Sequence, residues 1–222
     1  MIKAIVFDFD GTVIDTETAW YMAFREIYAQ HGVDLTLEQY SQCIGTSLHS
    51  FNPYEYLVTD LHLPLDLDEL RTSVRLRHAS LMEAEKVRPG VEEWLAAARK
   101  KGLGIGLASS SAAQWVERFL GQLGLREYFA CIRTADDVAR VKPDPELYLQ
   151  TLSCLGVQPH EAIAVEDSPN GVKAAVTAGL QCVLVPNAIT KYLRFDEVRR
   201  RADSLRDVNL DDLVSADFAG LT

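Results

Sequence analysis

From Arg88 onward the sequence alternates short apolar runs with segments of helical periodicity. The apolar runs at 103–108, 128–133, 162–165 and 182–185 have the length and the bounding turn residues of buried strands. Strands separated by helices of this length favour right-handed β-α-β crossovers, which produce a parallel sheet covered on both faces. The pattern therefore predicts an α/β fold.

A further apolar run at 5–7 stands ahead of a long stretch of helical spacing. A strand this short is not stable alone, so we expect it to join the same sheet. Residues 17–86 show helical periodicity and a capping-box pattern at 36–39, with no convincing strand. We therefore expect a core of residues 1–16 and 87–222. The α-helical segment 17–86 would be an inserted cap whose two connections allow it to close over a site.

Polar side chains follow several of the expected strands. They are Asp8 and Asp10 after the first strand, Ser109 and Ser110 after the run 103–108, Lys142 in a loop before a helix, and Glu166 with Asp167 after the run 162–165. In an open parallel sheet, ligands bind beyond the carboxyl ends of the strands. Each group alone has an ordinary explanation, such as a surface turn, a helix cap or a solvated lysine. Their convergence on one edge of the sheet predicts a common site.

The residue types in this group favour a metal and an anion. Four carboxylates with a serine and a lysine suit an oxygen-rich Mg²⁺ site beside a phosphate site. A carboxylate can attack phosphorus when a metal and a lysine offset the repulsion between the two anions. A second carboxyl group can donate a proton to the leaving oxygen and later take one from water.

The motifs resemble those of haloacid dehalogenase (HAD) superfamily hydrolases, in the branch that includes β-phosphoglucomutase and small-metabolite phosphatases. The matching segments, in the family's order over about residues 1–187, are Asp8-Phe9-Asp10-Gly11-Thr12, Ser109 after Leu107-Ala108, Lys142-Pro143, and Glu166-Asp167-Ser168 with Gly171. This resemblance implies a Rossmann-like, doubly wound parallel sheet with an α-helical cap inserted after the first motif.

The resemblance also implies a role for each residue of the group. Asp8 would be the nucleophile that forms an aspartyl-phosphate, and Asp10 the acid/base. The phosphoryl group would be held by Ser109, Ser110 and Lys142. Mg²⁺ would be held by Asp8, the backbone carbonyl of Asp10, Asp167, and Glu166 as a ligand or directly behind one.

Two alternatives to a phosphatase remain open. A phosphoryl transferase of the phosphoglucomutase type is disfavoured because Trp20, Ala112 and Ala113 replace mutase residues. The segment 44–48 also lacks the mutase's flanking basic residues. A non-enzymatic regulatory protein that retains the fold is disfavoured by the intact set of site residues. We therefore expect a Mg²⁺-dependent phosphatase that hydrolyses phosphomonoesters of small metabolites, such as sugar phosphates.

Composition and charge limit the partners and the cellular compartment that we expect for this protein. The formal net charge of −10 argues against a general nucleic-acid or anionic-membrane surface. No apolar run approaches the roughly 18 residues that a membrane span needs. Cys43, Cys131, Cys154 and Cys182 are scattered without C-x-x-C spacing, so we expect reduced thiols in a cytoplasmic protein. Nothing in the sequence demands a protein partner, so we expect a monomer that binds a small phosphorylated metabolite.

Overall fold

The structure, a computed structural model, describes residues 1–43, 51–195, 198 and 200–215. The segment 44–48, used above to weigh phosphoglucomutase activity, lies outside the described residues. The described chain divides into two compact units. The larger unit comprises Met1–Ile14, Lys86–Pro186 and Arg194–Thr222, and the smaller one Asp15–Glu85 and Asn187–Leu193.

The larger unit is built on one parallel sheet. Its strands are β1 (Ala4–Phe7), β2 (Gly104–Ala108), β3 (Cys131–Arg133), β4 (Ala162–Glu166), β5 (Gln181–Leu184) and β6 (Arg200–Arg201). They lie in the order β3-β2-β1-β4-β5-β6, and every neighbouring pair is parallel. β1 is central, with Ile5 paired to Ile105 on one side and to Ile163 on the other. The predicted parallel α/β sheet is confirmed.

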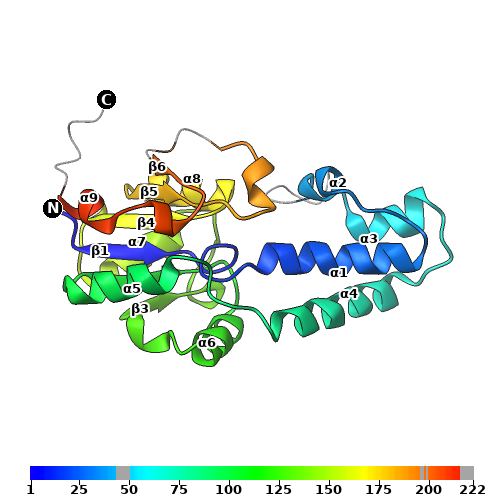
Figure 1. The fold of residues 1–222 in the computed structure, drawn as a ribbon, viewed down its shortest axis with the longest axis horizontal. Coiled ribbons are helices and arrows are strands. Elements are labelled where there is room, and N and C mark those ends of the chain that lie inside the picture. Colours follow the sequence, from blue (N-terminus) through cyan, green and yellow to red (C-terminus); the bar gives the residue numbers. More distant parts are fainter. Residues whose placement is uncertain (44–50, 196–197, 199, 216–222) are drawn as a thin grey trace. The chain divides into compact units, whose positions relative to one another are not determined.

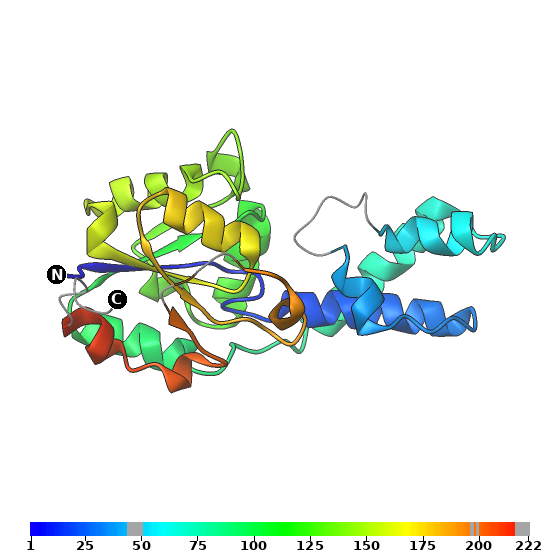
Figure 2. The same ribbon diagram turned by 90° about the horizontal axis from the view of Figure 1, so that it is seen from above.

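Helices cover both faces of this sheet. They are α5 (Val91–Lys100), α6 (Ala113–Gln122), α7 (Glu146–Leu155), α8 (Pro169–Thr177) and α9 (Leu210–Ser215). Figure 1 and Figure 2 show α7 and α8 on one face of the sheet and α5 and α9 on the other. This arrangement is the doubly wound one that the alternation of strands and helices predicts.

Small residues in the sheet let α7 and α8 approach closely. Ala4 and Val6 of β1 share a buried cluster with Leu152 of α7 and Val172 of α8. A Cβ atom on Gly106 of β2 would lie 2.5 Å from Thr151 Cγ2, so this position requires glycine if α7 is to keep its place. The close packing of α7 matters for function because the loop before this helix contains Lys142.

The smaller unit is helical. Its elements are α1 (Thr16–Gln30), α2 (Leu37–Ser41), α3 (Pro53–Glu55), a π-helical turn at Tyr56–Asp60, and α4 (Leu67–Met82). α1 packs along α4, and Trp20 stacks on His78 with 3.7 Å between ring centroids. The capping box predicted at 36–39 is present, with Gln39 N donating to Thr36 Oγ1 at 3.2 Å. Asn187–Leu193 belongs to this unit through Ile189, which lies in its apolar core.

The structure corrects two expectations about strands. The run predicted as a strand at 128–133 is a strand only from Cys131 onward, and Tyr128 instead ends a turn of 3₁₀ helix at Arg126–Tyr128. A strand that the sequence did not predict, β6, follows the run at 182–185 and pairs with β5. Two arginines on an edge strand carry little of the apolar signal on which strand prediction depends.

The structure also corrects the expectation of four reduced thiols. Cys131 of β3 and Cys154 of α7 form a disulfide, with their Cα atoms 6.2 Å apart, while Cys43 and Cys182 are free. The two bonded cysteines are 23 residues apart in the chain and belong to no short motif. They meet because α7 packs against β3.

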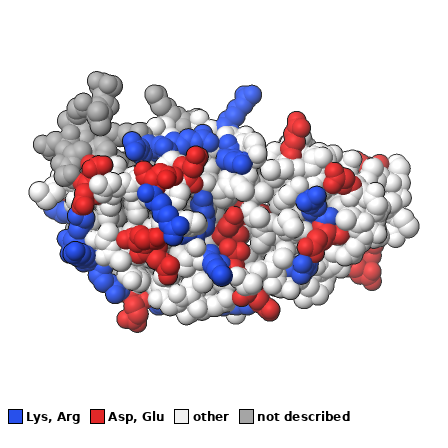
Figure 3. Space-filling model, in the orientation of Figure 1, with Lys and Arg blue, Asp and Glu red and all other residues white. Residues whose placement is uncertain are grey.

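Acidic and basic side chains are interspersed on the face of the molecule shown in Figure 3. None of the helices in the described ranges is long and apolar enough to cross a membrane.

Candidate active site

The candidate site begins where β1 ends. The backbone N–H of Asp8 donates to Val165 O of β4 at 2.9 Å, which extends the pairing of β1 and β4 by one residue. The chain then turns tightly, because the N–H groups of Thr12, Val13 and Ile14 all point to the carbonyl of Phe9. Gly11 has φ +86°, a conformation that favours glycine. The buried ring of Phe9 anchors the turn, so Asp8 and Asp10 are held at the edge of the sheet.

Arg88 braces this turn. Its guanidinium group donates to the carbonyl oxygens of Gly11, Val185 and Pro186, the latter two at 3.0 and 2.9 Å. A planar guanidinium with several fixed donors suits three carbonyls that converge from two loops. Arg88 therefore ties the turn after β1 to the segment that follows β5.

Lys142 joins two carboxylates at the centre of the site. Its Nζ lies 2.5 Å from Asp8 Oδ1 and 2.7 Å from Glu166 Oε1, and all three side chains are buried. Burial alone would lower the pKa of Lys142, but the charges of Asp8 and Glu166 outweigh this effect and raise the pKa above its usual range. Lys142 is therefore a fixed positive charge beside Asp8.

Glu166 is held from several sides. Its Oε1 also accepts a hydrogen bond of 2.6 Å from Tyr148 of α7, and its Oε2 accepts one of 3.2 Å from Asp167 N. α8 runs so close that a Cβ atom on Gly171 would lie 2.0 Å from the Glu166 carboxyl group. These contacts hold the carboxylate of Glu166 in an orientation that faces Lys142.

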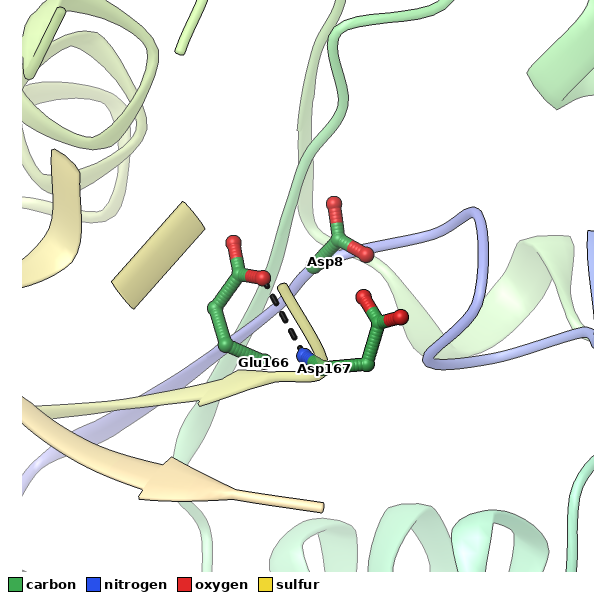
Figure 4. A group of neighbouring side chains, drawn as sticks. All are labelled: Asp8, Glu166 and Asp167. Carbon is green, nitrogen blue, oxygen red and sulfur yellow. Dashed lines mark hydrogen bonds between the residues drawn. The ribbon is translucent and has the colours of Figure 1, made fainter. Parts of the chain in front are cut away.

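Asp8, Glu166 and Asp167 form a buried acidic group. One carboxylate oxygen of each lies within 4.8 Å of the others, and Figure 4 shows the three side chains at the ends of β1 and β4. Asp8 Oδ2 is buried without a hydrogen-bond partner among the described residues. A buried carboxylate oxygen of this kind is costly unless a cation binds it. Three oxygen-donating side chains around such an atom fit a hard divalent cation such as Mg²⁺.

Asp10 lies in a separate set of contacts. Its Oδ2 accepts hydrogen bonds from Ser111 Oγ at 2.7 Å and Ser109 Oγ at 3.3 Å, and its Oδ1 accepts one from Trp115 Nε1 at 2.8 Å. Burial raises the pKa of Asp10, the hydrogen bond from Ser111 opposes this effect, and the charge of Asp8 raises the pKa further. The net direction is upward, which suits a group that carries a proton during a reaction.

The structure brings most of the predicted site residues together. Asp8, Lys142, Glu166 and Asp167 form one cluster, and Thr12 Oγ1 adds a hydrogen bond of 3.3 Å to Asp167. Ser109 is fully buried and donates a hydrogen bond of 3.3 Å to Asp10. Ser110 is exposed and lies outside this buried cluster.

Sequence reasoning missed three residues that contact the site: Ser111, Trp115 and Tyr148. Ser111 completes the serine run after β2, so the signal for it was present. Trp115 and Tyr148 lie on helices whose spacing indicates only a buried face. Nothing in that spacing shows that an indole N–H or a phenol would reach a carboxylate.

Comparisons with a family model and with known proteins agree on one family. The model of haloacid dehalogenase-like hydrolases matches residues 5–185, a range that contains all the site residues described above. The Bacillus subtilis (strain 168) protein YhcW is 49% identical over 210 residues, which cover 95% of each chain. Hexitol phosphatase B of Escherichia coli (strain K12) is 33% identical, and the match covers 83% of this chain and 84% of that protein.

A solved structure supports the same assignment. The crystal structure of CbbY from Rhodobacter sphaeroides in complex with phosphate is similar to this chain, with a TM-score of 0.69 and 32% sequence identity. The similarity covers 92% of this chain and 95% of that one. On its sequence, its sheet and the residues at the strand ends, the chain belongs to the haloacid dehalogenase-like hydrolase family.

Proposed function

We propose that this protein is a Mg²⁺-dependent phosphatase that hydrolyses phosphomonoesters of small metabolites through an aspartyl-phosphate. One observation carries the proposal: Asp8 is buried with one oxygen held by Lys142 at 2.5 Å, while its Oδ2 has no hydrogen-bond partner among the described residues. Lys142 fixes the position of this carboxylate, and a fixed carboxylate is a competent nucleophile. The relatives reported above support the choice of phosphorus as the electrophile.

Each residue of the site has a part in the proposed reaction. The Asp8 carboxylate attacks phosphorus and the ester P–O bond breaks, while Asp10 gives its proton to the departing oxygen. Asp10 then takes a proton from the water that attacks the aspartyl-phosphate, which releases phosphate and restores Asp8. Lys142 offsets the negative charge of Asp8 and of the phosphoryl group, and Ser109 would also hold the phosphoryl group.

Mg²⁺ would be held by Asp8, Asp167 and the backbone carbonyl of Asp10. Glu166 would either bind the ion directly or support one of its ligands from behind. The bound ion would supply Lewis acidity and charge neutralisation at the phosphoryl oxygens. The exposed Ser110 has the weakest support among the proposed phosphate-binding residues.

We further propose that residues 17–86 act as a cap that contributes to substrate choice. Two chain connections join this segment to the rest of the protein, an arrangement that permits closure. The name of the relative hexitol phosphatase B makes phosphorylated polyols and sugars the first substrates to test. The expectations of a monomer, of action in the cytoplasm and of no nucleic-acid partner remain predictions.

The test uses the whole protein with p-nitrophenyl phosphate and a panel of sugar, polyol and nucleotide monophosphates, with and without Mg²⁺. Asp8→Asn should lower turnover by at least about 1000-fold, because the amide is a poor nucleophile. The exposed Asp203 provides a matched control, and Asp203→Asn should keep full activity. Acid quenching should leave phosphate attached to the wild-type protein and not to Asp8→Asn.

Two outcomes would overturn the proposal. Equal turnover by Asp8→Asn and Asp203→Asn would remove Asp8 as the nucleophile. Formation of an isomeric sugar phosphate without release of inorganic phosphate would indicate a transferase.

A further inference from the structure

The carboxyl group of Asp10 is held by donors of two chemical kinds. Trp115 donates its indole N–H to Oδ1 at 2.8 Å. The hydroxyl groups of Ser111 and Ser109 face Oδ2 at 2.7 and 3.3 Å. The two oxygens of Asp10 therefore have different environments, and this difference bears on how the group can act.

An indole N–H can only donate a hydrogen bond, whereas a hydroxyl group can donate or accept. Oδ1 therefore always faces a hydrogen atom in the direction of Trp115. The contacts at Oδ2 are adjustable, because Ser111 can rotate its hydroxyl group from donor to acceptor. The contact from Trp115 is the fixed one, and it sets the orientation of the carboxyl group.

The indole of Trp115 is itself restrained. Trp115 lies in the first turn of α6, and this end of the helix is fixed by a hydrogen bond of 2.9 Å from Ala113 N to Asp136 Oδ2. The ring packs against Phe119, one turn further along, with 4.6 Å between ring centroids, and Phe119 is fully buried. The N–H of Trp115 is therefore aimed by packing that does not depend on Asp10.

We propose that Trp115 is a positioning residue: its N–H fixes the orientation of the Asp10 carboxyl group, which is the acid of the proposed reaction. This inference rests on the proposed phosphatase function. It adds a residue outside the family motifs described above. Oδ1 is the oxygen by which the carboxyl group is anchored.

The proposal predicts a dependence on the leaving group. An alkoxide leaves poorly without a proton, whereas p-nitrophenolate leaves readily without one. Trp115→Phe removes the N–H and keeps an aromatic ring against Phe119. For an alkyl phosphate that the wild-type protein hydrolyses, kcat should fall by about 10-fold or more while KM changes by less than about threefold. The single-turnover burst of p-nitrophenolate should change by less than about threefold.

Trp94 is a matched control elsewhere in the same unit. Its indole N–H donates to the carbonyls of Leu205 and Val208 at 2.9 and 3.1 Å, away from the carboxylates. Trp94→Phe should therefore leave kcat for both esters unchanged. Thermal unfolding of each variant shows whether the fold is retained.

One further variant keeps the test decisive if Trp115→Phe does not fold, and a double variant tests the coupling to Asp10 if it does. Ser111→Ala removes the adjustable hydroxyl at Oδ2 and should produce the same selective loss on the alkyl ester, with rescue by Ser111→Thr. In an Asp10→Asn background, Trp115→Phe should have no further effect on the alkyl ester, because the proton it positions is gone.

Each result of these experiments has a different meaning for the role of Trp115. An equal loss on both esters would show that Trp115 is merely structural, and a gain in kcat would show that it restrains Asp10 in an inactive position. Either result overturns this inference. Failure of the proposed function is a separate result, because it would appear in the wild-type protein and in Asp8→Asn without any change at Trp115.

Discussion

Tyr148 donates a hydrogen bond of 2.6 Å to Glu166 Oε1, and both side chains are fully buried. The same oxygen accepts a hydrogen bond from Lys142. The phenol thus supports, from α7, a carboxylate that lies against the centre of the site. A contact behind a metal-binding group orients that group, and its loss weakens metal binding.

Replacing Tyr148 with Phe removes this hydrogen bond and little else. The free energy of unfolding should fall by about 1–2 kcal/mol, as for a hydrogen bond to a charged group. Under the proposed function, the Mg²⁺ concentration for half-maximal activity should rise by about 10-fold. Urea unfolding and a Mg²⁺ titration measure the two effects. Tyr192→Phe is the control, because Tyr192 is 61% exposed and should show neither change.

Gly171 and Gly121 offer a paired test of how tightly α8 is packed. A Cβ atom on Gly171 would lie 2.0 Å from the Glu166 carboxyl group, whereas one on Gly121 would have nothing within 4 Å. Gly171→Ala should cost about 1–3 kcal/mol of stability through overpacking and should lower activity because Glu166 must move. Gly121→Ala should instead stabilise the protein by about 0.5–1 kcal/mol. Similar effects of the two substitutions would contradict the close approach of α8.

His78 should make stability depend on pH. Burial lowers the pKa of His78 to about 4 from 6.5, against an opposing hydrogen bond to the backbone of Thr16. The unfolded chain binds this proton near pH 6.5 and the folded protein only near pH 4, so stability is fully present above pH 6.5 and falls below it. Between pH 7.5 and pH 5 the loss should be about 2 kcal/mol.

The substitution His78→Phe tests this linkage. Phe keeps an aromatic ring against Trp20 and removes the titrating group. Between pH 7.5 and pH 5, urea unfolding should show that the free energy of unfolding falls by about 2 kcal/mol less in the variant than in the wild-type protein. An equal fall in both proteins would exclude His78 as the source of the pH dependence.

The disulfide predicts a labelling pattern and a stability change. Alkylation of the unfolded, unreduced protein should modify Cys43 and Cys182 only, and prior reduction should expose all four cysteines. Cys131→Ser with Cys154→Ser should lower the free energy of unfolding by about 3 kcal/mol, since the crosslink closes a loop of some twenty residues. Mass spectrometry and urea unfolding provide the measurements. Four labels without reduction would contradict the pairing.

The sequence alone predicted the parallel sheet because apolar runs and helical spacing are local patterns. It also predicted which residues follow the strands, and Asp8, Lys142, Glu166 and Asp167 do converge. Asp8, Glu166 and Asp167 meet because the carboxyl ends of parallel strands share an edge, and Lys142 joins them from the loop before α7.

Contacts made by side chains on helices were not predictable in the same way. Trp115 reaches Asp10 and Tyr148 reaches Glu166 because of helix rotation and ring direction, which no spacing specifies. The Cys131–Cys154 pair depends on how α7 lies over β3. Ser110 is exposed while its neighbour Ser109 is buried, since adjacent side chains diverge, and its role in binding phosphate stays a prediction.

The central place of β1 has a consequence for synthesis of the chain. β1 begins at Ala4, and its partners β2 and β4 begin at Gly104 and Ala162. At about 5–20 residues per second, a ribosome needs on the order of ten to thirty seconds to make the second partner after the first strand has emerged. Until β2 emerges this apolar strand has two unpaired edges, and until β4 emerges it keeps one. A chaperone that shields the nascent chain should therefore matter most before the residues of β4 leave the ribosome.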